Sequence, residues 1–237
     1  MDGEEGKPHF ALEGLIAVAG SIIQWLRDNL RLIELAHDIG PLVLQVANSG
    51  GVVFIPAFLG LYAPYWDRGA RGTIFGMTQY TLALHIARAA LEGVCYQVRA
   101  ILGAMANDLG APKDFLDCLP EPDSKPVLQT LRVDGGMSKA DEVLQIQADI
   151  LGKNVDVARA PIAECTALGA AIAAGMAAKD PTQRVWRNFE DLKEKVKGDR
   201  DQKPFSANQE DADRKKNLRR WEKAVERAKD WLEDDME

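Results

Sequence analysis

One stretch limits this chain's fold more than any other: "VDGGMSKADEVLQIQADILG", from Val133 to Gly152. It predicts a strand, a turn with two glycines and a helix, an order in which backbone can wrap a phosphate. Gly135 and Gly136 permit positive φ angles and leave no Cβ in the way of a ligand. Neither a P-loop nor the dinucleotide G-x-G-x-x-G spacing is present. A plain tight turn stays open as the alternative.

The rest of the body alternates between strand and helix patterns. Ser138 and Asp141 are predicted to cap the helix that follows the double glycine. Gly40 and Pro41 are predicted to end the first helix. Short apolar runs predict strands at residues 51–58, 72–77, 128–133 and 154–159, and helical periodicity predicts helices at 15–36, 85–107 and 165–178. This alternation predicts the α/β class, with a mixed sheet flanked by helices.

Charge divides the chain into two parts. Residues 179–237 hold as many basic as acidic side chains, so the net charge of -7 arises in residues 1–178. We therefore expect a polar lead at 1–9, a domain at 10–178 and a charged extension at 179–237. The extension ends in a predicted amphipathic helix that docks on the body through Leu218, Trp221, Ala224, Val225, Ala228, Trp231 and Leu232.

Composition excludes several classes of protein. A hydrophobic fraction of 46% supports a full core, and there is no apolar run of ~18 residues to span a membrane. The acidic, polar start predicts no signal peptide. Net negative charge argues against a nucleic-acid binder. Three scattered cysteines and three scattered histidines predict no disulfide frame and no metal site. These features fit a cytoplasmic protein and leave mitochondrial association open.

Several segments together resemble one enzyme family, the FGGY carbohydrate kinases, and within it the C-terminal half of the glycerol kinases. The run from Gly72 to Glu92 is similar to that family's C-terminal signature. The resemblance covers about residues 10–178 and rests on "FALEGLIAVAGSIIQWLRD", "FIPAFLGLYAPYWDRGARGTIFGMT", "HIARAALEGVCYQVRAIL", "LRVDGGMS", "IQADILG" and "ECTALGAAIAAG".

The resemblance implies an actin-like ATPase (ribonuclease H-like) fold, with ATP and Mg²⁺ as cofactors and glycerol as the phosphoryl acceptor. It places the adenine or ribose against Gly20, the amide of Gln24 within reach of it, and the backbone of Gly136 beside the α-phosphate. Ala140 stands where the family usually has an asparagine that contacts the base, so one hydrogen bond to the nucleotide is in doubt. Each residue also has a purely structural alternative: Gly20 serves only helix packing, Gln24 faces solvent, and Gly136 serves only the turn.

The family's phosphate loop, polyol-binding residues and catalytic aspartate have no match here, so no residue is assigned as the general base. Asp67 and Asp134 lie near turns, where aspartates usually bond local backbone. We expect binding of ATP or ADP, and of glycerol only when an N-terminal half completes the site. The alternatives are a non-catalytic actin-like interaction module and a truncated gene product. Homo-oligomer formation is left open.

Overall fold

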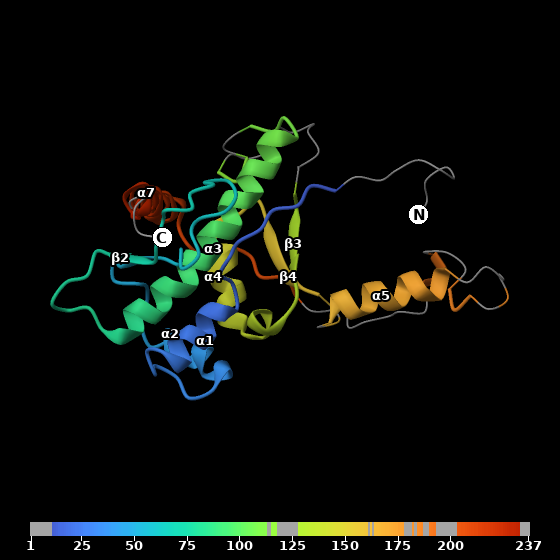
Figure 1. Ribbon diagram of the computed structural model, residues 1–237, viewed down its shortest axis with the longest axis horizontal. Coiled ribbons are helices and arrows are strands. Elements are labelled where there is room, and N and C mark those ends of the chain that lie inside the picture. Colours follow the sequence, from blue (N-terminus) through green and yellow to red (C-terminus); the bar gives the residue numbers. More distant parts are fainter. Residues whose placement is uncertain are drawn as a thin grey trace.

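The computed structural model describes residues 11–112, 115–117, 128–160, 162, 164–177, 182, 184–186, 190–192 and 203–232. A long helix, α3 (Ala83–Asp108), runs through the middle of the molecule (Figure 1). β1 (Val53–Ile55), β2 (Thr73–Phe75) and α7 (Asp211–Ala228) lie on one side of it. On the other side lie α4 (Asp141–Leu151), β3 (Thr130–Val133) and β4 (Asp156–Arg159).

The described strands form two small sheets. β1 pairs antiparallel with β2, with Phe54 opposite Ile74, and β3 pairs parallel with β4, with Leu131 opposite Val157. α3 packs on β1 and on α4, and α4 packs on β4, so two helices separate the pairs. The predicted alternation of strands and helices is confirmed, but among the described residues the expected mixed sheet is divided into an antiparallel and a parallel pair.

α3 supports the larger core along most of its length. The N–H of Leu82 donates to His85 Nδ1 at 3.0 Å, which satisfies one backbone donor at the helix start. Ala87, Ala90 and Leu91 are fully buried on the inner face. The sequence prediction of residues 85–107 is therefore confirmed to within two residues at each end.

The first predicted helix, at 15–36, is wrong in its length. Within that span, the α-helix α1 covers only Ser21–Asp28. Leu15 is 59% exposed, so its apolar spacing does not reflect burial. After α1 the backbone of Arg31 takes a φ of 54°, in the left-handed region that a right-handed helix cannot continue through.

Gly40 and Pro41 do not end a helix, as the sequence had suggested. A 3₁₀ helix, η1 (Ala36–Asp38), leads directly into α2 (Ile39–Val43), and both residues lie in the first turn of α2. Proline is tolerated there because first-turn N–H groups have no partner within the helix. This short element closes one side of the pocket described below.

α7 docks on the body through most of its predicted stripe. Trp221 is 1% exposed, stacks on Tyr96 with ring centroids 5.1 Å apart, and donates from Nε1 to the Tyr65 hydroxyl at 3.3 Å. Ala224, Val225 and Ala228 are also buried. The prediction is confirmed for these residues. It is wrong for Trp231, which lies beyond the helix end and is 62% exposed.

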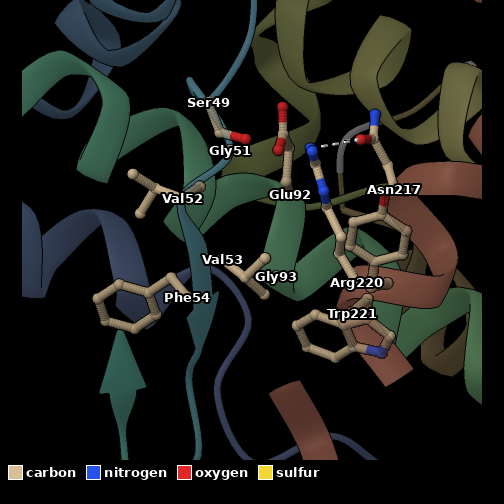
Figure 2. Close-up of a pocket in the computed structure, with 12 residues that line it drawn as sticks. Ser49, Gly51, Val52, Val53, Phe54, Glu92, Gly93, Asn217, Arg220 and Trp221 are labelled. Atoms are coloured by element: carbon tan, nitrogen blue, oxygen red, sulfur yellow. Dashed lines mark hydrogen bonds between the residues drawn. The ribbon is translucent and has the colours of Figure 1, made fainter. Parts of the chain in front are cut away.

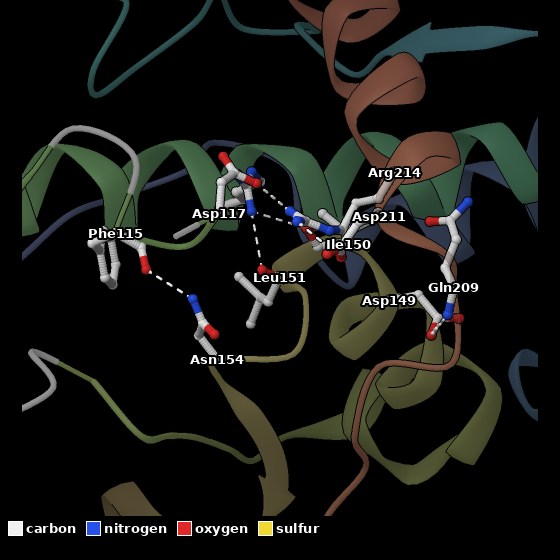
Figure 3. A network of polar contacts seen from close by, with 10 residues as sticks. Phe115, Asp117, Asp149, Ile150, Leu151, Asn154, Gln209, Asp211 and Arg214 are labelled. Atoms are coloured by element: carbon white, nitrogen blue, oxygen red, sulfur yellow. Dashed lines mark hydrogen bonds and ion pairs between the residues drawn. The ribbon is translucent and has the colours of Figure 1, made fainter. Parts of the chain in front are cut away.

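A buried polar network joins α3, α4 and α7 (Figure 3). The Asp117 carboxylate accepts from Arg99 Nη2 at 2.8 Å and from Arg214 Nη1. Arg99 Nη1 also donates to the carbonyls of Ile150 and Leu151, both at 3.1 Å, which satisfies acceptors at the C-terminal end of α4. Three elements distant in sequence are thereby fixed at one point.

α5 (Cys165–Met176) differs from the other helices. It extends away from the body (Figure 1), and none of its residues is buried. Near its C-terminal end the Gly175 carbonyl accepts from the Val185 N–H at 3.0 Å. No helix in the described part of the chain is both long and apolar enough to cross a membrane.

Candidate functional site

A pocket of about 820 Å³ opens where α1, α2 and the start of α4 meet. All four residues that the sequence singled out, Gly20, Gln24, Gly136 and Ala140, line it. They come from two segments more than a hundred positions apart: the start of α1, and the stretch from the double-glycine turn to the start of α4. The structure therefore brings together residues that only a resemblance had linked.

Gly20 and Gln24 form the α1 side of the pocket. Gly20 is the residue that caps the start of α1, not a residue inside a helix as predicted, and Gln24 is exposed one turn further on. A Cβ placed on Gly20 would have Met137 Cβ as its nearest neighbour, at 3.9 Å. α1 thus faces the double-glycine turn across the pocket.

The double-glycine turn forms the opposite side. Gly135 has φ 89° and ψ 178°, a conformation that residues with a Cβ rarely adopt. The 3₁₀ helix η2 (Gly136–Lys139) follows at once. A Cβ on Gly136 would meet nothing within 4 Å, so its backbone is open to the pocket. Ala140 then caps α4 without any side-chain hydrogen bond.

The predicted capping pair of Ser138 and Asp141 is wrong. Ser138 lies within η2, is buried, and donates from Oγ to the Gly135 carbonyl at 2.8 Å. The extra 3₁₀ turn moves the start of α4 to Asp141, so Ser138 is too early to cap it. Its hydroxyl instead closes the double-glycine turn upon itself.

Arg159, at the end of β4, braces this turn and was not anticipated from the sequence. Its Nε donates to the Ser138 carbonyl at 2.8 Å, and its Nη2 contacts Asp141 Oδ1 at 2.5 Å. One guanidinium therefore holds both η2 and the first residue of α4. The signal in the sequence was only a basic residue closing a strand, which is too common to mark a site.

The pocket combines apolar walls with few charges. Ile23, Ile39, Pro41 and Met137 supply the apolar surface. Lys139 adds one positive charge, and Asp141, which pairs with Arg159, and Glu142 add two negative ones. A Cβ on Gly40 would lie 2.3 Å from a Glu142 carboxylate oxygen. Apolar walls beside the open backbone of the double-glycine turn suit a ligand with an apolar ring and an anionic group.

The two turn aspartates serve the backbone. Asp67 accepts from the N–H groups of Ala70 at 2.8 Å and Asp230 at 3.1 Å, and Asp134 accepts from the N–H of Cys165 at 3.2 Å. Within the described residues, no three His, Cys, Asp or Glu side chains are grouped so as to hold a metal ion. These carboxylates therefore accept backbone N–H groups, Asp67 within its own turn and from the segment after α7, and Asp134 at the start of α5.

Comparison with known proteins shows the family of the chain. The model of the FGGY family of carbohydrate kinases, C-terminal domain, matches residues 1–178. The chain belongs to this family. It is 53% identical to the glycerol kinase of Saccharomyces cerevisiae, with 98% of this chain and 35% of that protein covered. It is 45% identical to the glycerol kinase of Leifsonia xyli, with 98% and 41% covered. The chain thus spans about two fifths or less of these relatives.

Solved structures confirm the predicted actin-like kinase fold. Plasmodium falciparum glycerol kinase with ADP matches with a TM-score of 0.69 and 33% identity, over 88% of this chain and 37% of that one. Xylulose kinase from Lactobacillus acidophilus matches with a TM-score of 0.67 over 90% of this chain and 39% of that one. Its identity of 22% supports the fold alone.

Proposed function

We propose that this chain supplies the nucleotide side of an ATP-dependent glycerol kinase, which converts glycerol to glycerol 3-phosphate. The observation that carries the proposal is the single pocket shared by Gly20, Gln24, Gly136 and Ala140. The similarity to glycerol kinases across nearly the whole chain supports glycerol as the phosphoryl acceptor.

In this proposal the base lies against the apolar walls, within reach of the Gln24 amide. The phosphates lie toward Gly136, where open backbone N–H groups attract negative charge. Arg159 acts as a positioning residue, because it holds the turn and α4 in one arrangement. Ala140 presents only a methyl group, so the base receives one hydrogen bond fewer than an asparagine would give it.

Catalysis requires groups beyond this pocket. Phosphoryl transfer needs Mg²⁺ on the phosphates, a positioned hydroxyl and a residue that orients it. The described residues do not fit a Mg²⁺ site, since Asp67 and Asp134 already accept backbone N–H groups. Holding both substrates in line lowers the activation barrier by ~7–11 kcal/mol in favourable cases. We therefore expect this chain alone to be inactive toward glycerol, and Mg²⁺ and glycerol to be held mainly by the rest of a kinase.

α5 favours an enzyme part over a free-standing interaction module. A module that works alone is expected to cover its apolar helices, because exposed apolar patches usually mark an interface. Every described residue of α5 is at least partly exposed, although alanine and glycine make up most of the helix. An uncovered helix of this kind fits a domain that completes its packing within a larger kinase.

The proposal is tested by measuring glycerol-dependent ADP release with this chain alone and mixed with the N-terminal half of a glycerol kinase. We expect no rate above a heat-treated control for the chain alone and a measurable rate for the mixture. A steady rate from the chain alone would contradict the proposed division of labour. A stable complex of the two halves without any activity would contradict the assignment as a kinase part.

A further inference from the structure

A second cavity, of about 420 Å³, lies between α3, α4, α7 and the loop at residues 47–51. It shares no lining residue with the pocket of Gly20 and Gly136. α4 connects the two, because Ala140 lines the first pocket and Asp149 lines the second. The second cavity has no role in the nucleotide site proposed above.

Two cations on α7 face this cavity without an acidic partner. Lys216 and Arg220 lie one helical turn apart, and among the described residues neither has a carboxylate within 4.0 Å. Within the described part of the chain, Arg220 Nη1 donates to the Asn217 side-chain oxygen, at 3.5 Å, and to no other group. Figure 2 draws an adjoining pocket that shares several lining residues with this cavity, and it shows Arg220 extending from α7 beside Glu92 of α3. Lys216 and Arg220 remain available to an anion.

The carboxylates that line the same cavity are mostly already engaged. Glu92 pairs with Arg88, with Nε to Oε1 at 2.9 Å. Asp149 accepts from the backbone N–H of Asn208 at 2.7 Å and from that of Gln209 at 3.3 Å. Asp213 lies in the first turn of α7, where helix N–H groups favour an acidic side chain. Arg88 also lines the cavity, but it is paired with Glu92, so among the lining cations in the described part of the chain Lys216 and Arg220 are the ones with no carboxylate within 4.0 Å.

Uncharged hydrogen-bonding groups complete the lining. Three segments of the chain supply these groups: the loop with Asn48 and Ser49, the stretch with Asn208 and Gln209, and α7 with Asn217. Amides and hydroxyls both donate and accept, which suits alcohol groups on a ligand, whereas a guanidinium and an ammonium suit a phosphate. We propose that this cavity binds a small hydroxylated anion of the phosphorylated-polyol class, with Lys216 and Arg220 on its phosphate.

The test is a titration of the ¹⁵N-labelled 237-residue chain, followed by amide NMR, with glycerol 3-phosphate, inorganic phosphate and glycerol as separate probes. We expect saturable shifts at Ser49, Asn208 and Asn217 with glycerol 3-phosphate. The affinity for inorganic phosphate should be at least tenfold weaker, and glycerol should bind weakest. Equal affinity for inorganic phosphate and glycerol 3-phosphate would overturn the polyol assignment. An absence of saturable shifts at these amides would overturn the site itself.

Matched variants separate the site from general surface charge. The double variant Lys216→Gln, Arg220→Gln should weaken glycerol 3-phosphate binding at least tenfold. The control Arg219→Gln removes a cation from the same helix outside the cavity and should leave binding unchanged. Equal loss in both variants would mean nonspecific attraction and would overturn the proposal. All three side chains are exposed, and unchanged far-UV circular dichroism should verify that folding is intact.

Discussion

Two alanine-rich helices of this chain have opposite surroundings. In α3 the side chains of Ala87, Ala89 and Ala90 are at most 1% exposed and pack in the main core. In α5 the sequence is even richer in alanine and glycine, yet no residue is buried. Similar composition has therefore produced one covered helix and one uncovered helix.

The difference shows that small apolar residues permit close packing but do not provide the surface to pack on. α3 has β1, α4 and α7 against it, each supplied by this chain. For α5, the described residues supply no comparable cover. The chain spans 35% of one glycerol kinase and 41% of another. We therefore expect the cover of α5 to come from the rest of an intact kinase.

Among substitutions in the covered part of the chain, we expect Trp221→Ala to lower the stability most. This substitution removes a fully buried ring from between α7 and α3, and such losses cost about 3–5 kcal/mol of unfolding free energy. Urea denaturation measures the change. Trp231→Ala is the matched control, because that ring is 62% exposed, and it should change stability by less than about 0.5 kcal/mol. Equal effects would show that α7 does not dock as described.

The next largest loss of stability is expected for Asp117→Asn, which removes the negative charge that pairs with Arg99 and Arg214. Breaking a buried ion pair costs about 3–5 kcal/mol, and the partial exposure of Asp117 puts the expectation near the lower limit. Asp108→Asn, at the exposed end of α3, is the control and should be close to neutral. Thermal unfolding compares the two. A neutral Asp117→Asn would contradict the role of this network in joining α3, α4 and α7.

One matched pair of substitutions tests directly whether α3 is covered and α5 is uncovered. Ala90→Leu overfills a fully buried position in α3 and should cost about 1–3 kcal/mol. Ala171→Leu adds the same atoms to an exposed position in α5 and should stay within about 0.5 kcal/mol. Denaturant midpoints with unchanged slopes give both values. If Ala171→Leu destabilised the chain as much as Ala90→Leu, α5 would be covered in solution and the contrast would be wrong.

Elements with strong periodicity and their own core face were predictable from the sequence. α3 and the docked part of α7 are of this kind, because their apolar residues repeat over several turns and are in fact buried. The span at residues 15–36 failed, since Leu15 and Leu30 fit the helical period but face solvent. Periodicity describes which side chains share a face, and it contains no information on whether that face has a partner.

The candidate site was predictable only in part. Gly20 and Gly136 have no pattern in common, and a resemblance was needed to expect them in one pocket. The brace from Arg159 to Ser138 could not be foreseen, because it depends on the η2 turn and on β4 ending beside it. Whether these residues bind a nucleotide stays a prediction.

The most direct test of the central claim is a titration of the ¹⁵N-labelled chain with ATP, read from amide shifts. We predict a dissociation constant of about 1 mM or weaker, equivalent to about -4.1 kcal/mol, because the other half of the clamp and the usual asparagine at Ala140 are lacking. The Gly136 amide should shift first among the turn glycines, together with Gly20 and Gln24. Tight micromolar binding, or shifts confined to residues away from these three, would contradict the account.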